Sequence, residues 1–341
     1  MTAPEQPDRQ RRRLRPIVIT IAAVGAVLIA GVGTAAAGDR GWWGKKHRPR
    51  PAVSATPSPS PVGASSSPAQ AAETSGSVAP APATPTGSSA ADTGATGIAR
   101  PPANAGFDYQ ISQAYTPPTG VEIVSRDHSE SPATGKYNIC YVNGFQAQPE
   151  EASDWQANHD DLLLKQGGSY VVDGDWDEIL LDISTSAKRA ALTEIMGVWI
   201  DQCATKGFQA VEVDNLDSWT RSNDLLTQAD AVAYAGLLVT RVHGAGLAIG
   251  QKNTVEIASI GRSQIGFDFA IAESCVQYEI TDGVPECQGY IDAYGAYVIL
   301  IEYDGSHFQQ ACSRYGETLS IVQRDRDVTA PGSSTYVFES C

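Results

Sequence analysis

Short apolar runs that do not alternate with polar residues constrain this fold more than any other feature. Strands that carry apolar side chains on both faces must be buried on both faces, as in a parallel sheet. The runs at 178–183 and 297–303 have this character. Together with less uniform runs they make nine strand candidates: 107–112, 121–125, 137–142, 178–183, 209–214, 246–252, 267–273, 297–303 and 319–324.

Helical patterns separate the later strand candidates. Residues 186–206 carry apolar side chains at helical spacing, and residues 227–243 start with a Thr suited to capping and are followed by Gly244. From residue 178 onward the order is strand, helix, strand, which predicts parallel strands. About eight such strands over roughly 250 residues indicate an α/β fold of the (β/α)8 barrel type.

The first three strand candidates fit a barrel less well. The links between them, 113–120 and 126–136, are too short to hold a helix, and the chain has one candidate more than a barrel needs. Either one strand belongs to an insertion or the first βα units are degenerate. An open doubly wound sheet is the competing fold.

Polar side chains gather where the later strand candidates end. In a barrel these ends meet at one mouth, where active sites are built. A carboxylate beside an apolar wall can have a raised pKa while its partner stays ionised. The polar residues at these ends are Asp214, Asn215, Asp217, Lys252, Asn253, Glu273, Glu302 and Asp304.

Two of these carboxylates match the needs of glycoside hydrolysis. One carboxyl group must protonate the leaving oxygen, and another must attack the anomeric carbon or activate water. Asp214 and Glu273 come from strands two apart in the expected order, so we expect them to face each other across the mouth. We take Glu273 as the acid and Asp214 as the nucleophile or base, with the reverse assignment open. Rings that could stack on sugars or hold an ammonium come from Tyr109, Tyr141, Trp219, Tyr278 and Tyr303.

Each of these residues also has a structural interpretation. A carboxylate at a strand end often caps the next helix, and Asp217 is a candidate for such a cap. Glu302 could form an ion pair with Lys252, and the aromatic rings could belong to the core. The histidines lack the i, i+4 spacing of a zinc hydrolase, so we expect no metal and no organic cofactor.

The residues at these strand ends also carry a resemblance to a known family. The sequence resembles glycoside hydrolase family 114, the endo-α-1,4-polygalactosaminidase family, and the order and spacing of the matching segments are similar too. These segments are FDYQIS (107–112), GFQAVEVDNLDSW (207–219), GLAIGQKN (246–253), FDFAIAESCVQY (267–278) and VILIEYD (298–304).

The resemblance implies a (β/α)8 barrel that hydrolyses α-1,4-linked galactosamine polymers internally, with Asp214 and Glu273 as catalytic carboxylates. Two departures concern residues 113–136, which lack an expected helix, and residues 305–341, which match less clearly. Because loops at a barrel mouth set substrate choice, the substrate could differ. The resemblance also implies a pocket lined by Tyr109, Gln110, Asn215, Lys252, Asn253 and Glu302.

Charge divides the chain into two parts. Residues before Gly106 hold 11 Lys and Arg against 5 Asp and Glu, a net +6, and residues 106–341 hold 13 against 34, a net −21. So acidic a domain is a poor partner for nucleic acid and would attract a cationic amino-sugar polysaccharide. The same charge is also typical of a generic soluble surface.

The six cysteines indicate disulfide bonds. All lie after residue 106, their number is even, and none form a CxxC pair. With an export signal, this pattern favours three disulfides over a metal site. Pairing between neighbours would give Cys140–Cys203, Cys275–Cys287 and Cys312–Cys341, with other connectivities open.

The N-terminal third predicts export. A basic segment (1–15) precedes an uncharged segment (16–38) that is long enough to span a bilayer. Residues 39–105 begin basic and continue as a Pro/Ala/Ser/Thr-rich linker, which cannot bury enough apolar surface to fold. We favour a membrane anchor over a cleaved signal, and either one places a monomeric domain at 106–341 outside the cytoplasm.

Two other classes of function stay open. A carbohydrate-binding barrel displayed on the linker would bind the polymer without cutting it. A polysaccharide-active enzyme of another kind would be a glycosidase for a different linkage or a metal-dependent deacetylase that uses Asp214 and Asp217. The small number of histidines argues against the deacetylase.

Overall fold

The computed structural model of the chain describes residues 97–281 and 284–341. The expected basic segment, the expected signal or anchor and most of the expected linker lie outside the described residues. Within the described ranges, no helix is both long and apolar enough to cross a membrane.

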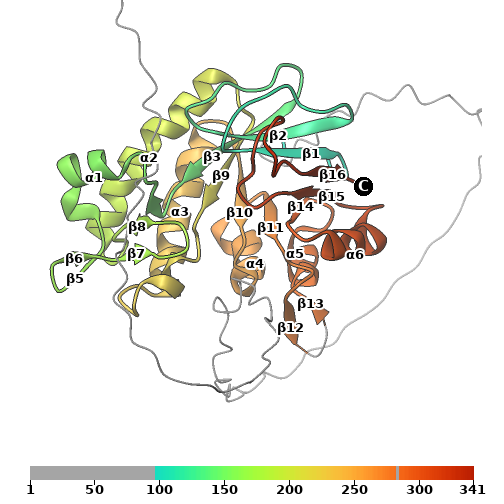
Figure 1. The fold of residues 1–341 in the computed structure, drawn as a ribbon. Helices are drawn as coiled ribbons and strands as arrows, with labels where there is room; N and C mark the ends of the chain where they lie inside the picture. The colour runs from blue at the N-terminus through green and yellow to red at the C-terminus, as the bar shows by residue number, and fades with distance from the viewer. Residues whose placement is uncertain (1–96, 282–283) are drawn as a thin grey trace, which may run out of the picture. The chain divides into compact units, whose positions relative to one another are not determined.

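Eight parallel strands follow one another in the sheet in the order in which they occur along the chain (Figure 1). A further strand, β16 (Phe338–Ser340), pairs antiparallel with the last of them. The eight strands are β1 (Gly106–Gln110), β2 (Val121–Asp127), β3 (Tyr137–Asn143), β9 (Ala210–Asp214), β10 (Ala248–Lys252), β11 (Phe269–Glu273), β14 (Val298–Glu302) and β15 (Ser320–Arg324).

Side chains join the first strand to the last. The fully buried Arg324 donates to the carboxylate of Asp108 at 2.9 Å and to the backbone carbonyl of Tyr109. At the other end of the strands, the N–H of Ala105 donates to Ser320 Oγ at 3.0 Å. The sheet therefore closes on itself, which confirms the expected (β/α)8 barrel and excludes an open doubly wound sheet.

The strands are apolar on both faces because both faces are buried. In β11, Phe269 and Ile271 belong to the inner cluster of the barrel, whereas Ala270 and Ala272 belong to the outer cluster that packs against the helices. Gly250 makes room inside the barrel, since a Cβ there would lie 2.7 Å from the Phe269 ring. This double burial is the physical reason for the missing alternation.

The two helices predicted from sequence are present. Helix α2 (Ser186–Lys206) is capped by Thr185, and α3 (Gln228–Gly244) starts with a capping box between Thr227 and Asp230. The glycine expected to follow α3 is its last residue. The other helical elements that follow α2 in the described residues are η2 (Ser218–Arg221), η3 (Val255–Ile257), α4 (Ala258–Ile260), η4 (Gly261–Ile265), α5 (Cys287–Tyr294) and α6 (Gly305–Tyr315).

The front of the barrel is degenerate, as the short links predict: no helix separates β1, β2 and β3. The surplus strand candidate at 178–183 is not part of the barrel. Its core, β8 (Glu178–Leu180), lies in a small antiparallel sheet with β4 (Gln146–Ala147) and β7 (Val172–Asp173). Its apolar side chains are buried on both faces there too, which is why its sequence looks like that of a barrel strand.

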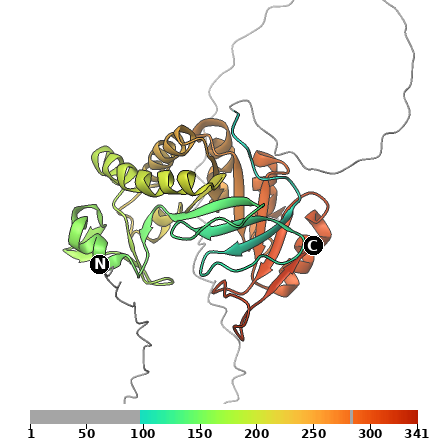
Figure 2. The same ribbon diagram turned by 90° about the horizontal axis from the view of Figure 1, so that it is seen from above.

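This small sheet belongs to an insertion between β3 and α2, the light-green part at the side of the barrel in Figure 2. The insertion also contains α1 (Ala152–Asn158), η1 (Asp160–Leu162) and the hairpin β5 (Lys165–Gln166) to β6 (Ser169–Tyr170). A second hairpin, β12 (Glu279–Thr281) to β13 (Val284–Pro285), follows β11.

Three disulfides fasten the outer layer. Cys140–Cys203 joins β3 to α2, Cys275–Cys287 joins the segment after β11 to α5, and Cys312–Cys341 joins α6 to the C-terminal residue. They close loops of 63, 12 and 29 residues, and each such bond typically stabilises a fold by about 2–4 kcal/mol. These are the three pairs of neighbouring cysteines.

Candidate active site

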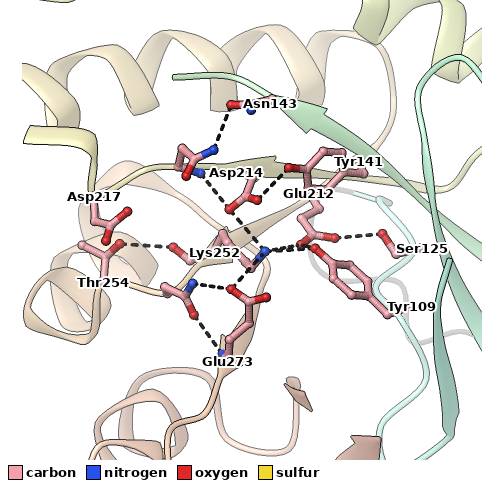
Figure 3. A network of polar contacts seen from close by, with 12 residues as sticks. Tyr109, Ser125, Tyr141, Asn143, Glu212, Asp214, Asp217, Lys252, Thr254 and Glu273 are labelled. Carbon is pink, nitrogen blue, oxygen red and sulfur yellow. Dashed lines mark hydrogen bonds and ion pairs between the residues drawn. The ribbon is translucent and has the colours of Figure 1, made fainter. Parts of the chain in front are cut away.

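Polar side chains from several barrel strands meet around one lysine at the C-terminal ends of the strands (Figure 3). Nζ of Lys252 lies 3.0 Å from Glu212 Oε1, 3.2 Å from Asp214 Oδ1 and 3.5 Å from Glu273 Oε2. Burial by itself would lower the pKa of Lys252, but the three carboxylates outweigh burial and raise it well above its ordinary value. Lys252 is therefore a buried ammonium ion that neutralises part of the acidic charge.

Asp214 ends β9 and has both oxygens occupied. Oδ2 accepts from the hydroxyl of Tyr141 at 2.8 Å, and Oδ1 accepts from the backbone N–H of Asn215 at 2.7 Å. Tyr141 lies on the neighbouring strand β3, which pairs with β9 in register at this level. The carboxylate is thus held by two elements of the barrel as well as by Lys252.

Glu273 ends β11 and is held in a similar way. Oε1 accepts from the hydroxyl of Tyr303 at 2.5 Å, and Oε2 accepts from the amide of Asn253 at 2.9 Å. The Asn253 amide oxygen in turn accepts from the backbone N–H of Glu273 at 2.9 Å. Burial would raise the pKa of Glu273, but Lys252, followed by the hydrogen bonds from Tyr303 and Asn253, lowers it.

The two carboxylates share one pocket. Their oxygens nearest to Lys252 lie no more than 6.7 Å apart, because the 3.2 Å and 3.5 Å contacts to Nζ join them. The side chains of Asp214 and Glu273 are 17% and 20% exposed, whereas those of Glu212 and Lys252 are 0% and 1% exposed. Asp214 and Glu273 can therefore touch a substrate, and Glu212 and Lys252 lie beneath them.

Glu212 is a site residue that the sequence analysis missed. It accepts from Tyr109 at 2.9 Å and from Ser125 at 2.8 Å, in addition to its contact with Lys252. Burial raises the pKa of Glu212, and Lys252 works against this effect. A signal was present in the sequence: Glu212 interrupts an apolar strand two residues before Asp214, on the same side of that strand.

The residue after each central side chain has a left-handed backbone. Asn215, Asn253 and Ser274 have φ angles of 64°, 49° and 54° and directly follow Asp214, Lys252 and Glu273. Such a conformation costs a non-glycine residue about 1–3 kcal/mol and is concentrated at functional sites. The turn after each strand is therefore stabilised by its surroundings.

Asn215 shows how one of these turns is held. Its amide nitrogen donates to Asn143 Oδ1 and Glu178 Oε2, both at 3.1 Å, and its amide oxygen accepts from Arg221 Nη2 at 3.1 Å. We call Asn143, Glu178 and Arg221 the Asn215 clamp. Burial raises the pKa of Glu178 to about 7, although its hydrogen bond from Asn143 works in the other direction. No sequence motif marks Glu178, which belongs to the insertion.

Asp217 pairs with an arginine and does not cap a helix. It forms a two-pronged ion pair with Arg221, with contacts of 2.8 Å and 2.9 Å. It occupies the residue before η2, but its side chain makes no capping hydrogen bond, so the capping interpretation is wrong. Asp173 of the insertion also pairs with Arg221, at 2.6 Å, and thereby ties the insertion to the site.

Glu302 does not pair with Lys252, and that interpretation is also wrong. Its Oε1 accepts from the backbone N–H of Val276 at 3.1 Å, and its Oε2 is buried without a hydrogen-bond partner. Burial raises the pKa of Glu302 to about 7. The reason is geometric: Lys252 is drawn toward Glu212, Asp214 and Glu273.

Some of the other expected site residues are buried, and others are partly exposed. Tyr109, Gln110 and Tyr141 are buried, and the Gln110 amide is occupied by Asp108 and Arg126. Trp219 packs against the outer core cluster. The residues left partly exposed near the carboxylates are Asn215, Asn253, Tyr278 and Tyr303.

The part of the chain that the structure describes contains one cluster with metal-ligand atom types, Cys275, Cys287 and Glu302. The two cysteines are bonded to each other and have no thiolate to offer a metal. The chemistry of this donor set therefore does not fit a metal ion.

A closed α/β barrel with two accessible carboxylates at its mouth agrees with a match to a family model. The model of glycoside-hydrolase family GH114 matches residues 88–341. The chain belongs to family GH114. It is thus a glycoside hydrolase, and the resemblance seen in the sequence is confirmed over the whole barrel.

One solved structure supports the barrel fold, and a second is less similar. The structure of Ega3 from Aspergillus fumigatus, a complex with galactosamine, is 23% identical and covers 70% of this chain and 96% of its own, with a TM-score of 0.55. The glycoside hydrolase domain of PelA from Pseudomonas aeruginosa is 16% identical and covers 67% and 97%, with a TM-score of 0.45. No functionally curated protein gives a significant sequence match.

Proposed function

We propose that this GH114 protein is an endo-acting hydrolase of α-1,4-linked, galactosamine-containing polysaccharide, with Asp214 and Glu273 as its catalytic pair. The observation that carries the proposal is the pair itself. Two accessible carboxylates at the barrel mouth, with oxygens no more than 6.7 Å apart, are placed to act on one glycosidic bond.

We assign different roles to the two carboxylates. Glu273 protonates the leaving oxygen, and Asp214 attacks the anomeric carbon or activates water. The lowered pKa of Glu273 means that only a minor fraction of the free enzyme carries the required proton at neutral pH. Glu273 therefore acts as an acid in an enzyme that works best at acidic pH.

The charge of the site favours a cationic polymer. Three carboxylates, Glu212, Asp214 and Glu273, surround the single ammonium of Lys252, and the domain from Gly106 onward carries a net −21. A protonated amino sugar would be attracted to such a mouth. The galactosamine bound by Ega3 supports the same substrate class.

We place the enzyme outside the cytoplasm, as a monomer held at the membrane by residues 16–38 and extended from it by the linker. The basic and uncharged N-terminal segments and the six disulfide-bonded cysteines support this location.

Mass spectrometry of a defined galactosamine oligomer tests the activity. The purified protein should shorten the oligomer to internal fragments, and Asp214→Asn and Glu273→Gln should each lose most of the activity, by about 100-fold or more. Asp304→Asn is a matched control, because Asp304 caps α6 on the surface. Wild-type turnover in either of the first two variants removes that residue from the mechanism.

The same experiment separates the two rival functions. A carbohydrate-binding barrel would bind the oligomer and release no new reducing ends. A deacetylase would release acetate and lose activity in EDTA.

A further inference from the structure

A cation and an exposed aromatic ring lie beside the catalytic pair. The guanidinium carbon of Arg326 lies 5.0 Å from the ring centroid of Trp176 and 5.8 Å from that of Tyr303. Trp176 belongs to the turn between β7 and β8 in the insertion, and Arg326 follows the end of β15 by two residues. Arg326 thus joins two loops that are far apart in the chain.

This arrangement lies next to the acid. The two distances to Arg326 place the ring centroids of Trp176 and Tyr303 no more than 10.8 Å apart, and Tyr303 donates to Glu273. An oligosaccharide that reaches Glu273 spans such a distance. Burial acts to raise the pKa values of Glu273 and Tyr303, and the charge of Arg326 makes a smaller opposing contribution to each, as expected of a guanidinium that faces the site. The pKa of Tyr303 remains raised overall.

The Trp176 ring is exposed enough to contact a sugar. Its side chain is 40% exposed, although one face is covered by Arg326. A flat aromatic ring stacks well on the apolar face of a pyranose. A sugar on the exposed part of this ring would lie close to a positive charge.

We propose that Arg326 and Trp176 form a sugar subsite that takes an N-acetylated amino sugar in preference to one with a free ammonium group. The proposal rests on the proposed function and deepens it. A guanidinium offers donors and no acceptor, so it can bind the carbonyl oxygen of an acetamido group, and it repels an ammonium. The group formed by Lys252 and its three carboxylates is negatively charged overall, whereas the Arg326 subsite is positively charged. Two neighbouring sugar units of one polysaccharide would therefore meet sites with opposite preferences for an ammonium group.

The experiment compares kcat/KM of the full chain on two α-1,4-linked galactosamine oligomers of equal length, one fully deacetylated and one partly N-acetylated. The wild type should prefer the partly acetylated oligomer. Arg326→Gln should lower this preference by about 3- to 10-fold, mainly by faster cleavage of the deacetylated oligomer. Arg326→Lys keeps the charge and should keep the preference.

Trp176 has a conservative control of its own. Trp176→Ala should raise KM for both oligomers by about fivefold with a smaller change in kcat, and Trp176→Phe should restore most of the loss. Thermal melts of all four variants identify any that fail to fold.

A ratio within twofold of the wild type in Arg326→Gln overturns the proposal, and so does an equal loss in Arg326→Lys. If the wild type cuts neither oligomer, the proposed function fails by itself. Calorimetric affinities of the two oligomers for the wild type and Arg326→Gln then decide the subsite: an affinity ratio that depends on Arg326 supports it, and an unchanged ratio overturns it.

Discussion

Lys252 sets the electrostatic balance of the active site. It is 1% exposed and contacts three carboxylates, two of which are open to substrate. A buried ion pair contributes little net stability on average, yet the removal of one partner costs about 3–5 kcal/mol because a charge is left uncompensated. We therefore interpret Lys252 as the residue that holds Asp214 and Glu273 close together.

The pH dependence of activity tests this balance. If Glu273 is the acid, kcat/KM follows the protonated fraction of Glu273 in the free enzyme. Its pKa lies below the ordinary value of 4.5, so this fraction falls as pH rises. We expect kcat/KM to be highest at acidic pH and to decline as the pH rises from about 5 to 7.

Lys252→Met supplies the control for this profile. Without the ammonium, the pKa of Glu273 rises, and the descending limb should move to higher pH by about one unit or more. Lys252→Arg keeps the positive charge, so it should shift the descending limb of the pH profile less. An activity optimum above pH 7 in the wild type would exclude Glu273 as the acid.

At the scale of elements, the turns that follow β9, β10 and β11 build the site. Each strand delivers one polar side chain to the mouth, and the next residue then takes a left-handed conformation that turns the chain away. The turn after β9 depends on the Asn215 clamp, which contains Glu178 of the insertion and Arg221 of η2. The insertion is therefore part of the active site.

Substitution of Asn215 tests the Asn215 clamp. Asn215→Gly tolerates the positive φ but frees the turn, so the N–H that holds Asp214 is no longer fixed. We expect kcat to fall by about 10- to 100-fold with a smaller change in KM. Asn215→Ala should lose as much activity and, because of its strained φ, about 1 kcal/mol more stability.

Asn223→Gly is the matched control for backbone freedom. Asn223 has a φ angle of 56° and lies in an exposed loop, where its side chain contacts Gln166. This variant should keep the kcat of the wild type. Steady-state kinetics and urea unfolding measure both effects, and a normal kcat in Asn215→Gly would show that the clamp does not position Asp214.

At the scale of the whole molecule, buried carboxyl groups couple stability to pH. Burial raises the pKa values of Glu178, Glu286 and Glu302 to about 7. An acid whose pKa is higher in the folded state keeps its proton there, so folding becomes less favourable as pH rises from its unfolded pKa to its folded pKa. All three groups act in the same direction between about pH 4.5 and 7.

We therefore expect the free energy of unfolding to fall between pH 5 and pH 8, on the order of 1 kcal/mol for each group. Gln at all three positions imitates the protonated acid and should flatten this dependence, with the largest gain in stability at pH 8. Thermal melts across this range provide the measurement. A wild-type melting temperature that rises from pH 5 to pH 8 would contradict the prediction.

The amino-acid sequence is sufficient to predict the barrel and to nominate a catalytic pair. Apolar runs, helical spacing and capping residues are local signals, and they predicted the eight wall strands and helices α2 and α3. The end of a parallel strand is also a position that sequence can name, so the proposed pair, Asp214 and Glu273, could be assigned to the barrel mouth from sequence alone. The apolar run at 178–183 was wrongly included among the barrel strand candidates. A strand that is buried on both faces has the same sequence pattern in a barrel and in an insertion.

Which side chains meet at the mouth depends on the three-dimensional structure of the barrel. Glu212, Glu178 and Arg326 come from a strand interior, an insertion and the last loop, and their contacts join residues far apart in the chain. The ion-pair partner of Lys252 likewise depends on the tertiary structure: Lys252 contacts Glu212 and not Glu302. A local sequence pattern indicates which side chains are buried. It does not indicate which charged groups interact, because these groups become neighbours only when the barrel closes.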